Sequence, residues 1–311
     1  MVEFSTNPVS WLGFLLFAVG APLWMGIVNK LKARLSGRCG PSVFQTFYDL
    51  ARLARKETVY SRSASFITRL APVIVWNTTA LAVLILPIGP FPPAISFSGD
   101  FILLAYLLGT GRFFQILAGL DVASSFQGMG ASREARFAVF AEPIFFFTFG
   151  SLALVTGHAS LSLQSIFKDI AWDQPFFAVF IVISSISIFF LMLAECSRIP
   201  VDDPNTHLEL TMIHEVMILD ASGFDLFLYQ HAASLKVLLY ALLVASLLNP
   251  FSWLNLFDGT LFFIASLGVI AVVLALIETL MARFRLVLVP QFLLYATIIG
   301  VLNILIFTIS H

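Results

Sequence analysis

The stretch Ala194-Glu195-Cys196-Ser197-Arg198-Ile199-Pro200-Val201-Asp202-Asp203-Pro204 follows a long apolar run and opens an acidic segment that continues to Asp225. Arg198 is the only Lys or Arg in this segment. Its acids are Glu195, Asp202, Asp203, Glu209, Glu215, Asp220 and Asp225. Acids are scarce elsewhere, because the chain is 59% hydrophobic and only 11% charged. Their concentration beside an apolar run predicts that protons or cations are handled there.

The composition is typical of an integral membrane protein. The mean hydropathy is +0.96, and apolar runs of about twenty residues recur along all 311 residues, the length that spans a bilayer as a helix. The net charge of −1 gives no reason to expect a nucleic-acid partner. Two cysteines, Cys39 and Cys196, suit neither a disulfide framework nor a zinc ligand set. We therefore predict an all-α protein with a single membrane domain over residues 1–311.

Eight runs are long and apolar enough to be transmembrane helices. They cover residues 11–29, 70–88, 99–120, 135–156, 176–194, 233–248, 260–281 and 292–310. The run at 233–248 is the shortest, so this helix is expected to borrow residues from its flanks. Turn formers such as Gly89-Pro90 and Asn249-Pro250 separate the runs.

The basic residues indicate how these helices are oriented. Loops at 30–69, 121–136, 195–232 and 282–291 hold nine, two, one and two Lys or Arg, which is fourteen of the seventeen. Cytoplasmic loops carry such an excess of cations. The prediction is a multi-pass protein of the cell inner membrane with both termini on the outer side, a basic cytoplasmic segment at 30–69 and an acidic cytoplasmic loop at 195–232.

The basic segment is expected to contain a surface helix. Within Pro41 to Glu57, apolar Phe44, Phe47, Leu50 and Leu53 recur at intervals of about three residues among polar ones. This spacing describes an amphipathic helix that lies on the membrane surface.

Charged residues within or at the ends of the apolar runs include the cations Arg112 and Lys236 and the carboxylates Glu142, Glu195 and Glu278. A charge at the bilayer centre costs about 2.5–3.5 kcal/mol, so each should face the bundle interior or water. Buried carboxylates can hold and release protons near neutral pH, which makes the three glutamates candidates for a proton path. Two other interpretations remain open: Glu195 and Glu278 could reach the headgroups, and Arg112 could be a structural partner of a carboxylate. Asp100, at the start of a run, is expected to cap its own helix.

The acidic loop is expected to contain a short amphipathic helix. Asp203-Pro204 is a helix-start signal, and Leu208, Met212, Val216 and Leu219 follow at helical spacing. His207 and His214 are seven residues apart, which does not match a closed metal site, and His214-Glu215 lacks the second histidine of a zinc-protease helix. These histidines either join a proton relay or are solvated. The glycine pattern Gly128 to Arg133 has no strand before it, so we do not interpret it as a nucleotide site.

Several motifs, taken in order, resemble the heel-subunit family of respiratory complex I (NADH dehydrogenase subunit 1). They are closer to its hydrogenase branch, which includes formate hydrogenlyase subunit 4 and hydrogenase-4 component C. The motifs are Arg38-Cys39-Gly40-Pro41 before the surface helix, Gly119-Leu120-Asp121, Gly130 to Ala135, Glu142-Pro143, Glu195-x-x-Arg198-Ile199-Pro200-x-Asp202, and Met281 to Arg285.

The resemblance implies a membrane subunit of a group 4 nickel–iron hydrogenase-like, ion-translocating oxidoreductase. This chain would hold no cofactor; the nickel–iron centre and iron–sulfur clusters would lie in a peripheral arm, and antiporter-like subunits would be membrane partners. The arm would dock on cytoplasmic loops containing Arg34, Arg38, Arg133, Arg198 and Arg283. The proton path would use Glu142, Glu195, Asp202, Asp203, Glu209 and Glu215.

Other functions remain open at this stage. Complex I members usually continue the signature with a glutamate-rich stretch, whereas this chain has Asp202-Asp203-Pro204-Asn205. The difference favours the hydrogenase branch over the alternative, a quinone-chamber subunit of a complex I-like enzyme. A stand-alone secondary transporter would also have buried carboxylates, but we find no paired broken helices. A passive membrane anchor would not need Glu142.

Overall fold

The chain folds into a bundle of long helices in a computed structural model, which describes residues 3–4, 8–156, 162–168, 172, 175–202, 212–250 and 256–310. Within that part, eight helices are long and apolar enough to cross a membrane, which confirms the predicted number. The long helices are α1 (Pro8–Leu35), α3 (Phe66–Ile85), α4 (Asp100–Asp121), α5 (Ser125–Thr156), α7 (Pro175–Glu195), α9 (Gly223–Leu247), α10 (Leu256–Leu280) and α11 (Val289–Ser310). The short elements are α2 (Gln45–Ala54), α6 (Leu163–Lys168), α8 (His214–Met217) and the antiparallel strands β1 (Glu3–Phe4) and β2 (Ile95–Ser96).

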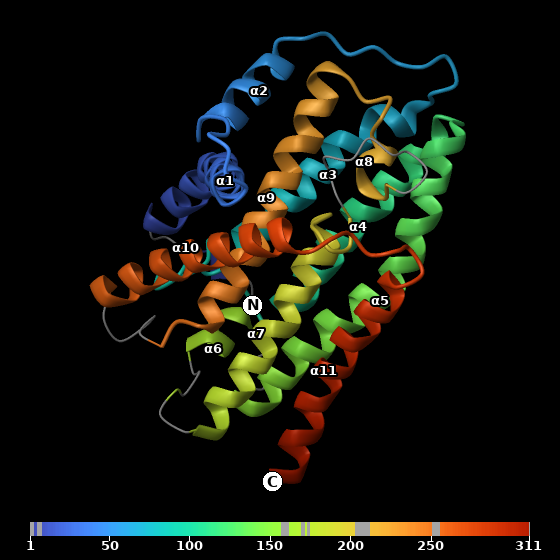
Figure 1. Cartoon of the computed structure of the whole chain (residues 1–311). Helices are drawn as coiled ribbons and strands as arrows, with labels where there is room; N and C mark the ends of the chain where they lie inside the picture. The colour runs from blue at the N-terminus through green and yellow to red at the C-terminus, as the bar shows by residue number, and fades with distance from the viewer. Residues whose placement is uncertain are drawn as a thin grey trace.

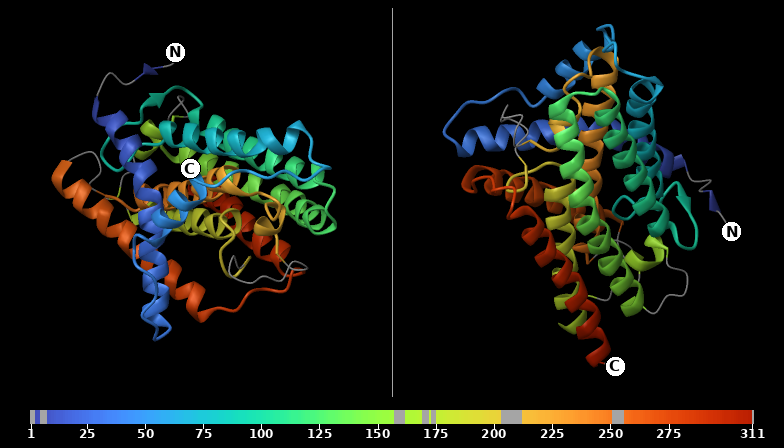
Figure 2. Two further views of the ribbon diagram at one scale, coloured as in Figure 1. Left: turned by 90° about the horizontal axis from the view of Figure 1, so that it is seen from above. Right: turned by 90° about the vertical axis from the view of Figure 1, so that its right-hand side faces the viewer.

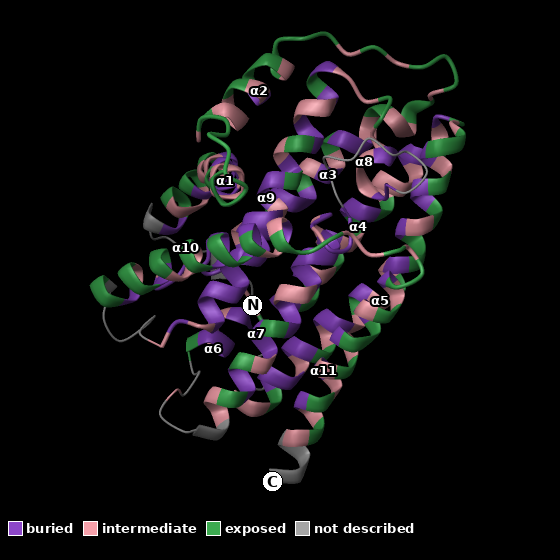
Figure 3. Cartoon of the chain, in the orientation of Figure 1, coloured by how far each residue is buried: buried purple, intermediate pink, exposed green. Residues whose placement is uncertain are grey.

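Helix α9 lies at the centre of the bundle. It packs against α1, α3, α7 and α10, and almost every residue of its second half is buried. A helix surrounded on all sides must be apolar on all faces, and the sequence from Val237 to Leu247 is almost uniformly apolar. Figure 3 shows the buried residues concentrated along α9 and α7. The one cation in this helix, Lys236, must therefore find a partner inside the protein.

Helices α1 and α10 are steeply inclined to the other long helices and cross each other (Figures 1 and 2). They are in direct contact where the indole nitrogen of Trp24 donates a hydrogen bond to the carbonyl of Leu267 at 3.4 Å. The remaining helices, among them α3, α4, α5, α7 and α11, run more nearly along one common direction. The crossed pair leaves one side of α9 to be covered by the short helix α2.

A tight joint places α2 over that side. A Cβ atom on Gly26 of α1 would lie 1.9 Å from the carbonyl oxygen of Val43, so only glycine allows the returning chain to come this close. Gly40 adopts a φ of +64° in the turn. Helix α2 then packs on α1 and α9 with Leu50 buried. Its position on the membrane surface remains a prediction.

The helix boundaries differ from the predicted ones at two places. Helix α5 begins at Ser125, ten residues before the predicted 135, so most of the expected loop at 121–136 is helical. Helix α9 begins at Gly223 and takes its extra residues on the N-terminal side. In both cases charged residues lower the hydropathy of the first turns, although the helix continues through them.

Asp100 was predicted to cap its own helix, and this prediction is wrong. The N-cap of α4 is Gly99, with a φ of +84°. The buried Asp100 carboxylate instead accepts hydrogen bonds from the backbone N–H of Leu163 at 2.7 Å and the hydroxyl of Ser162 at 2.9 Å. It therefore satisfies an unpaired N–H at the start of α6. The helix predicted from Asp203-Pro204 begins outside the described residues; its described part is the single turn α8.

Candidate functional site

Arg112, in the middle of α4, is the hub of a buried charge network. Its guanidinium lies 2.5 Å from Glu195 of α7, 3.5 Å from Glu134 of α5 and 3.9 Å from Glu142 of the same α5. Glu134 and Glu195 are both buried. The prediction that Arg112 would partner a carboxylate is therefore confirmed, and it has three such partners.

Two further cations complete the network. Lys236 of α9 lies 2.7 Å from the second oxygen of Glu195, and the His214 Nε2 of α8 lies 3.2 Å from Glu134. The three carboxylates thus face two permanent cations and one titratable one. Removing buried charges from water is costly unless each is paired, and with His214 protonated the charges cancel. Proton exchange at His214 therefore changes the net charge of the whole network.

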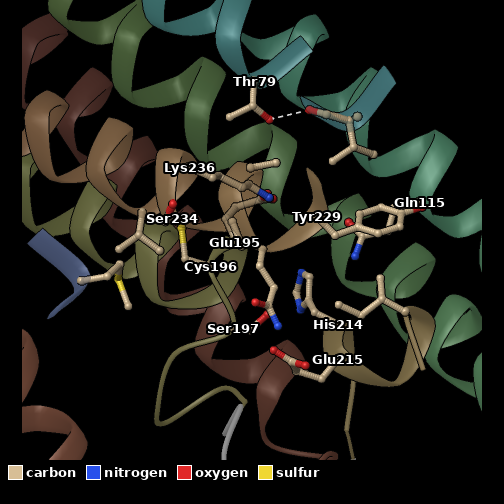
Figure 4. A pocket seen from close by; sticks show the side chains of 18 of the residues that line it. Thr79, Gln115, Glu195, Cys196, Ser197, His214, Glu215, Tyr229, Ser234 and Lys236 are labelled. Carbon is tan, nitrogen blue, oxygen red and sulfur yellow. Dashed lines mark hydrogen bonds and ion pairs between the residues drawn. The ribbon is translucent and has the colours of Figure 1, made fainter. Parts of the chain in front are cut away.

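A cavity of about 460 Å³ adjoins this network (Figure 4). It is bounded by α1, α2, α3, α4, α7, α8 and α9. Figure 4 shows Glu195, Cys196, His214 and Lys236 around it. Thr46 and Asp49 bring polar groups to it from α2. A cavity of this size with many polar walls can hold water or part of an amphipathic ligand.

Glu142 lies at the other end of the network and points away from the bundle. Its side chain is 57% exposed, whereas the Glu195 side chain is 3% exposed. It sits in a hollow of about 210 Å³ on the outer face of α4 and α5, beside Tyr106 and Thr110. Of the two expected environments for this carboxylate, the bundle interior and water, the first does not agree with this exposure. Since the hollow is at the middle of two membrane helices, Glu142 faces either lipid or a neighbouring protein.

The environment of His214 sets its protonation. Burial is the largest single influence and lowers the pKa of the imidazole, but the combined attraction of Glu134 and, less strongly, Asp202 outweighs it, so the pKa lies above its usual value. The neighbouring Cys196 behaves differently, because burial raises the pKa of its thiol to about 12. At neutral pH the thiol is therefore protonated and chemically inert, while the imidazole can exchange protons.

A second charge cluster braces the crossed helices. Glu278 of α10 lies 2.5 Å from Lys32 of α1 and 3.3 Å from Arg198, and its side chain is 1% exposed. The predicted alternative in which Glu278 reaches the headgroups does not agree with this burial. Arg198 also donates a hydrogen bond to the sulfur of Met25 at 3.1 Å. The cluster ties α1, α10 and the segment after α7 together.

The third cluster holds α8 in place. Asp202 accepts hydrogen bonds from the backbone N–H groups of Ile213 and His214 at 3.0 and 3.3 Å, and its other oxygen lies 2.9 Å from Arg283. Arg133 donates a hydrogen bond to the carbonyl of Met212 at 2.8 Å. Three of the predicted residues, Asp202, Arg133 and Arg283, thus have partners inside this chain.

The predicted path residues are only partly brought together. Glu142 and Glu195 meet through Arg112, and Glu215 lines the cavity. Asp202 lies beside Arg283 in a separate cluster. Asp203 and Glu209 lie outside the described residues, as do His207 and Thr211.

The predicted docking residues also divide into groups. Arg34 and Arg38 are exposed, Arg133 and Arg283 are half-buried, and Arg198 is buried against Glu278. Arg198 is therefore not part of an exposed surface on this chain. Its guanidinium is committed to the brace described above.

Two network residues were missed from the sequence. Glu134 was assigned to a loop because the hydropathy falls between Arg133 and Arg136. Lys236 was noted only as a cation within a predicted membrane helix. A signal for both existed: a charge inside a long helix requires a partner. Extending α5 back to Ser125 would have placed Glu134 about two turns from Glu142, within reach of one arginine. The described residues contain no group of three or more His, Cys, Asp or Glu that could hold a metal ion.

A family model described as NADH dehydrogenase matches residues 9–309. The chain belongs to this family. It is 30% identical over 230 residues to hydrogenase-4 component C of Escherichia coli K12, covering 74% of this chain and 71% of the relative. It is also 30% identical over 286 residues to formate hydrogenlyase subunit 4 of the same strain, covering 89% and 90%.

The fold is also similar to a solved structure. A chain of the membrane-bound sulfane sulfur reductase, an archaeal respiratory membrane complex, superposes with a TM-score of 0.79 at 18% identity, covering 95% of this chain and 97% of that one. At this identity the likeness concerns the fold. Together with the two relatives, the family match confirms the resemblance inferred from the motifs around Arg38, Glu142 and Glu195.

Proposed function

We propose that this NADH dehydrogenase family member is the membrane subunit of a group 4 nickel–iron hydrogenase-like, ion-translocating oxidoreductase. It docks the peripheral redox arm and supplies carboxylates to a proton path. The observation that carries the proposal is the charge network that starts at a polar cavity and ends at the outward-facing Glu142. The printed names of the two relatives, hydrogenase-4 component C and formate hydrogenlyase subunit 4, support the hydrogenase type.

The order of contacts gives the path. From the cavity, protons would reach Glu195 directly and Glu134 by way of His214, Lys236 would hold the Glu195 carboxylate, and Arg112 joins both carboxylates to Glu142. Carboxylates and imidazole can bind and release protons, whereas the guanidinium stays charged. Arg112 therefore acts by holding the carboxylates near one another and setting their charge balance, and protons pass between carboxylates through water.

The exposure of Glu142 indicates the next member of the path. A charge facing lipid near the bilayer centre costs about 2.5–3.5 kcal/mol, so a polar group of a neighbouring membrane subunit should cover the hollow beside it. Antiporter-like subunits of the same complex fit this role. The redox arm, with its nickel–iron and iron–sulfur centres, would dock on the opposite side, over the exposed Arg34 and Arg38.

The cation distribution supports an orientation. Since Lys and Arg gather after α1 and in the N-terminal part of α5, this end is proposed to face the cytoplasm, with both termini on the outer side of the inner membrane. The cavity mouth near α2 then opens toward the side on which the arm docks. The acidic loop, part of which is outside the described residues, would lie at the same side with Asp203 and Glu209.

The cavity favours a second candidate function. A volume of about 460 Å³ is within the usual range for small-molecule sites, so the chain would alternatively form a quinone chamber in a complex I-like enzyme. A stand-alone transporter has no comparable support. Purification in mild detergent followed by mass spectrometry distinguishes the three functions. A co-purifying nickel–iron large subunit supports the hydrogenase type, and a quinone-reducing arm without nickel ligands supports the quinone chamber. A lone homo-oligomer supports the transporter.

The proton role is tested by Glu142→Gln in the assembled complex. In proteoliposomes we expect electron transfer to lose its coupled proton transport, because the amide cannot carry a proton. Tyr106→Phe is the matched control, since Tyr106 lines the same hollow and carries no carboxylate. Coupled transport and turnover at wild-type levels in Glu142→Gln would show that the proposed path is wrong.

A further inference from the structure

His214 stands between two cavities. It lines the cavity of about 460 Å³ and also a void of about 10 Å³ that Glu134 and Glu195 share. A void of that size is at the lower limit for a single water molecule. Glu195 lines both of these spaces, whereas Glu134 lines only the small void, so the imidazole lies between the large polar cavity and the Glu134 carboxylate.

The two ring nitrogens of His214 have different surroundings. Nε2 lies 3.2 Å from Glu134. Both nitrogens are buried without a hydrogen bond of good geometry in the described part of the chain, so Nε2 meets Glu134 as a charge contact, whereas Nδ1 has no such carboxylate beside it in that part. A buried polar atom beside a polar cavity is normally satisfied by water, and a ring with an acceptor of protons on one side and a carboxylate on the other is suited to proton transfer.

The position of this ring is set from outside the network. The carboxylate of Asp202 accepts hydrogen bonds from the backbone N–H groups of Ile213 and His214, which fixes the start of α8. Arg283, from the segment between α10 and α11, holds that carboxylate at 2.9 Å. Asp202 is 1% exposed and does not line the large cavity. Its contacts are those of a residue that positions α8.

Charged groups reach His214 from every element packed around it. They are Glu134 from α5, Lys236 from α9, Glu195 from α7, Arg112 from α4 through Glu134, Asp202 from the segment after α7, and Glu215 from α8 itself. Glu134 is the closest of them to the ring. Because this carboxylate offsets the cost of burial, the charged imidazole is accessible at physiological pH.

We propose that His214 is the group through which protons move between the cavity and Glu134, and that Asp202 is its positioning residue. The proposal rests on the proton path described above and names its entry. A proton from cavity water binds Nδ1, and the Nε2 proton passes to the carboxylate of Glu134. The ring is then neutral in the other tautomer, and it returns to the first by rotation or by a second exchange with water.

The test is His214→Gln in the assembled complex, measured as coupled proton transport in proteoliposomes across a range of pH. We expect transport to fall about 10²-fold, the contribution usual for a positioned proton-transfer group. The wild-type rate should decline as the pH rises through the raised pKa of the ring, and this decline should be absent in the variant. Cys196→Ser is the control, because its thiol lines the same cavity and is protonated at neutral pH.

Chemical rescue gives a second measurement that a structural role would not produce. In His214→Ala the cavity gains room for a small base, and added imidazole should restore a measurable part of the transport. Gel filtration and subunit composition establish that each variant has assembled. Absence of rescue in an assembled His214→Ala complex, or wild-type transport and pH dependence in His214→Gln, would overturn the proposal.

Asp202→Asn separates positioning from proton transfer. We expect a lower rate at every pH with the wild-type pH dependence retained, since the amide oxygen can still accept both N–H groups of α8, whereas the NH2 group cannot pair with Arg283. Loss of the pH dependence in this variant, with retention in His214→Gln, would reverse the two roles and refute the assignment.

The outcomes also distinguish this inference from the proposed function. If Glu142→Gln uncouples the complex while His214→Gln does not, the path stands and its entry lies elsewhere. If neither substitution affects coupled transport, the proposed path fails, and the entry proposed here fails with it.

Discussion

Replacing Arg112 by Gln should destabilise the protein through the carboxylates left behind. The substitution removes the guanidinium from Glu134 and Glu195, which are both buried. Breaking a buried ion pair typically costs about 3–5 kcal/mol. Glu195 keeps Lys236 at 2.7 Å, and Glu134 keeps His214 at 3.2 Å. The loss of stability should therefore be at the lower end of this range.

A free-energy loss of about 3 kcal/mol corresponds to about 150-fold in the folding equilibrium. For a chain of this size it lowers the melting temperature by about 6 °C, at about 2 °C per kcal/mol. The melting temperature of the detergent-solubilised complex can be followed by tryptophan fluorescence. Thr110→Ala is the control on the same helix, because Thr110 is exposed and its hydroxyl bonds only to the preceding turn.

A double-mutant cycle with Glu195→Gln isolates the interaction itself. If Arg112 and Glu195 stabilise each other, the double variant should be more stable than the two separate losses predict, with a coupling of about 2–3 kcal/mol. Additive losses within about 0.5 kcal/mol, or an Arg112→Gln variant as stable as Thr110→Ala, would refute the reasoning that the guanidinium neutralises these carboxylates.

Two smaller predictions follow from the geometry of α1 and the cysteines. Gly26→Ala should prevent α2 from docking and lower the melting temperature, because its Cβ would lie 1.9 Å from a backbone oxygen. Gly20→Ala is the control and should have little effect, because its Cβ would meet nothing within 4 Å. Equal melting temperatures for the two variants would contradict the close packing of α1 against the chain before α2. A membrane-impermeant maleimide should label the exposed Cys39 in inside-out vesicles and not in intact cells, whereas the buried thiol of Cys196, with its pKa raised to about 12, should react slowly from either side. Labelling of Cys39 in intact cells would reverse the predicted orientation.

Hydropathy and charge were sufficient to predict the eight spanning helices, because each must satisfy its backbone polar groups internally and present about twenty apolar residues to lipid. They were insufficient for helix ends. Helix α5 continues back through Arg133 and Glu134, since Glu134 is neutralised by Arg112 and His214 from distant parts of the sequence. A single-sequence hydropathy window contains no information about partners that lie 22 and 80 residues away.

The same limit explains which site residues could be predicted. Glu142 and Glu195 are recognisable as charges within or beside apolar runs, but the direction in which Glu142 points depends on how α4 packs on α5. Asp202 illustrates the opposite case. It belongs to an acidic segment, which suggested proton transfer, yet two backbone N–H groups and Arg283 occupy its carboxylate. Chemical type was predictable from the sequence, whereas role depended on contacts.

A comparison of Glu142 with Glu278 shows why a membrane carboxylate is not by itself a proton carrier. Glu278 lies between Lys32 and Arg198 with a side chain that is 1% exposed, and it lines neither the large cavity nor the outer hollow. A proton carrier of the kind proposed must receive a proton from one side and release it on another, so it needs access at both ends. Glu142 has Arg112 on one side and the outer hollow on the other. Glu278 has two cations beside it and lines neither of these spaces. Its charge therefore serves to hold α10 against α1, next to the wall of the large cavity.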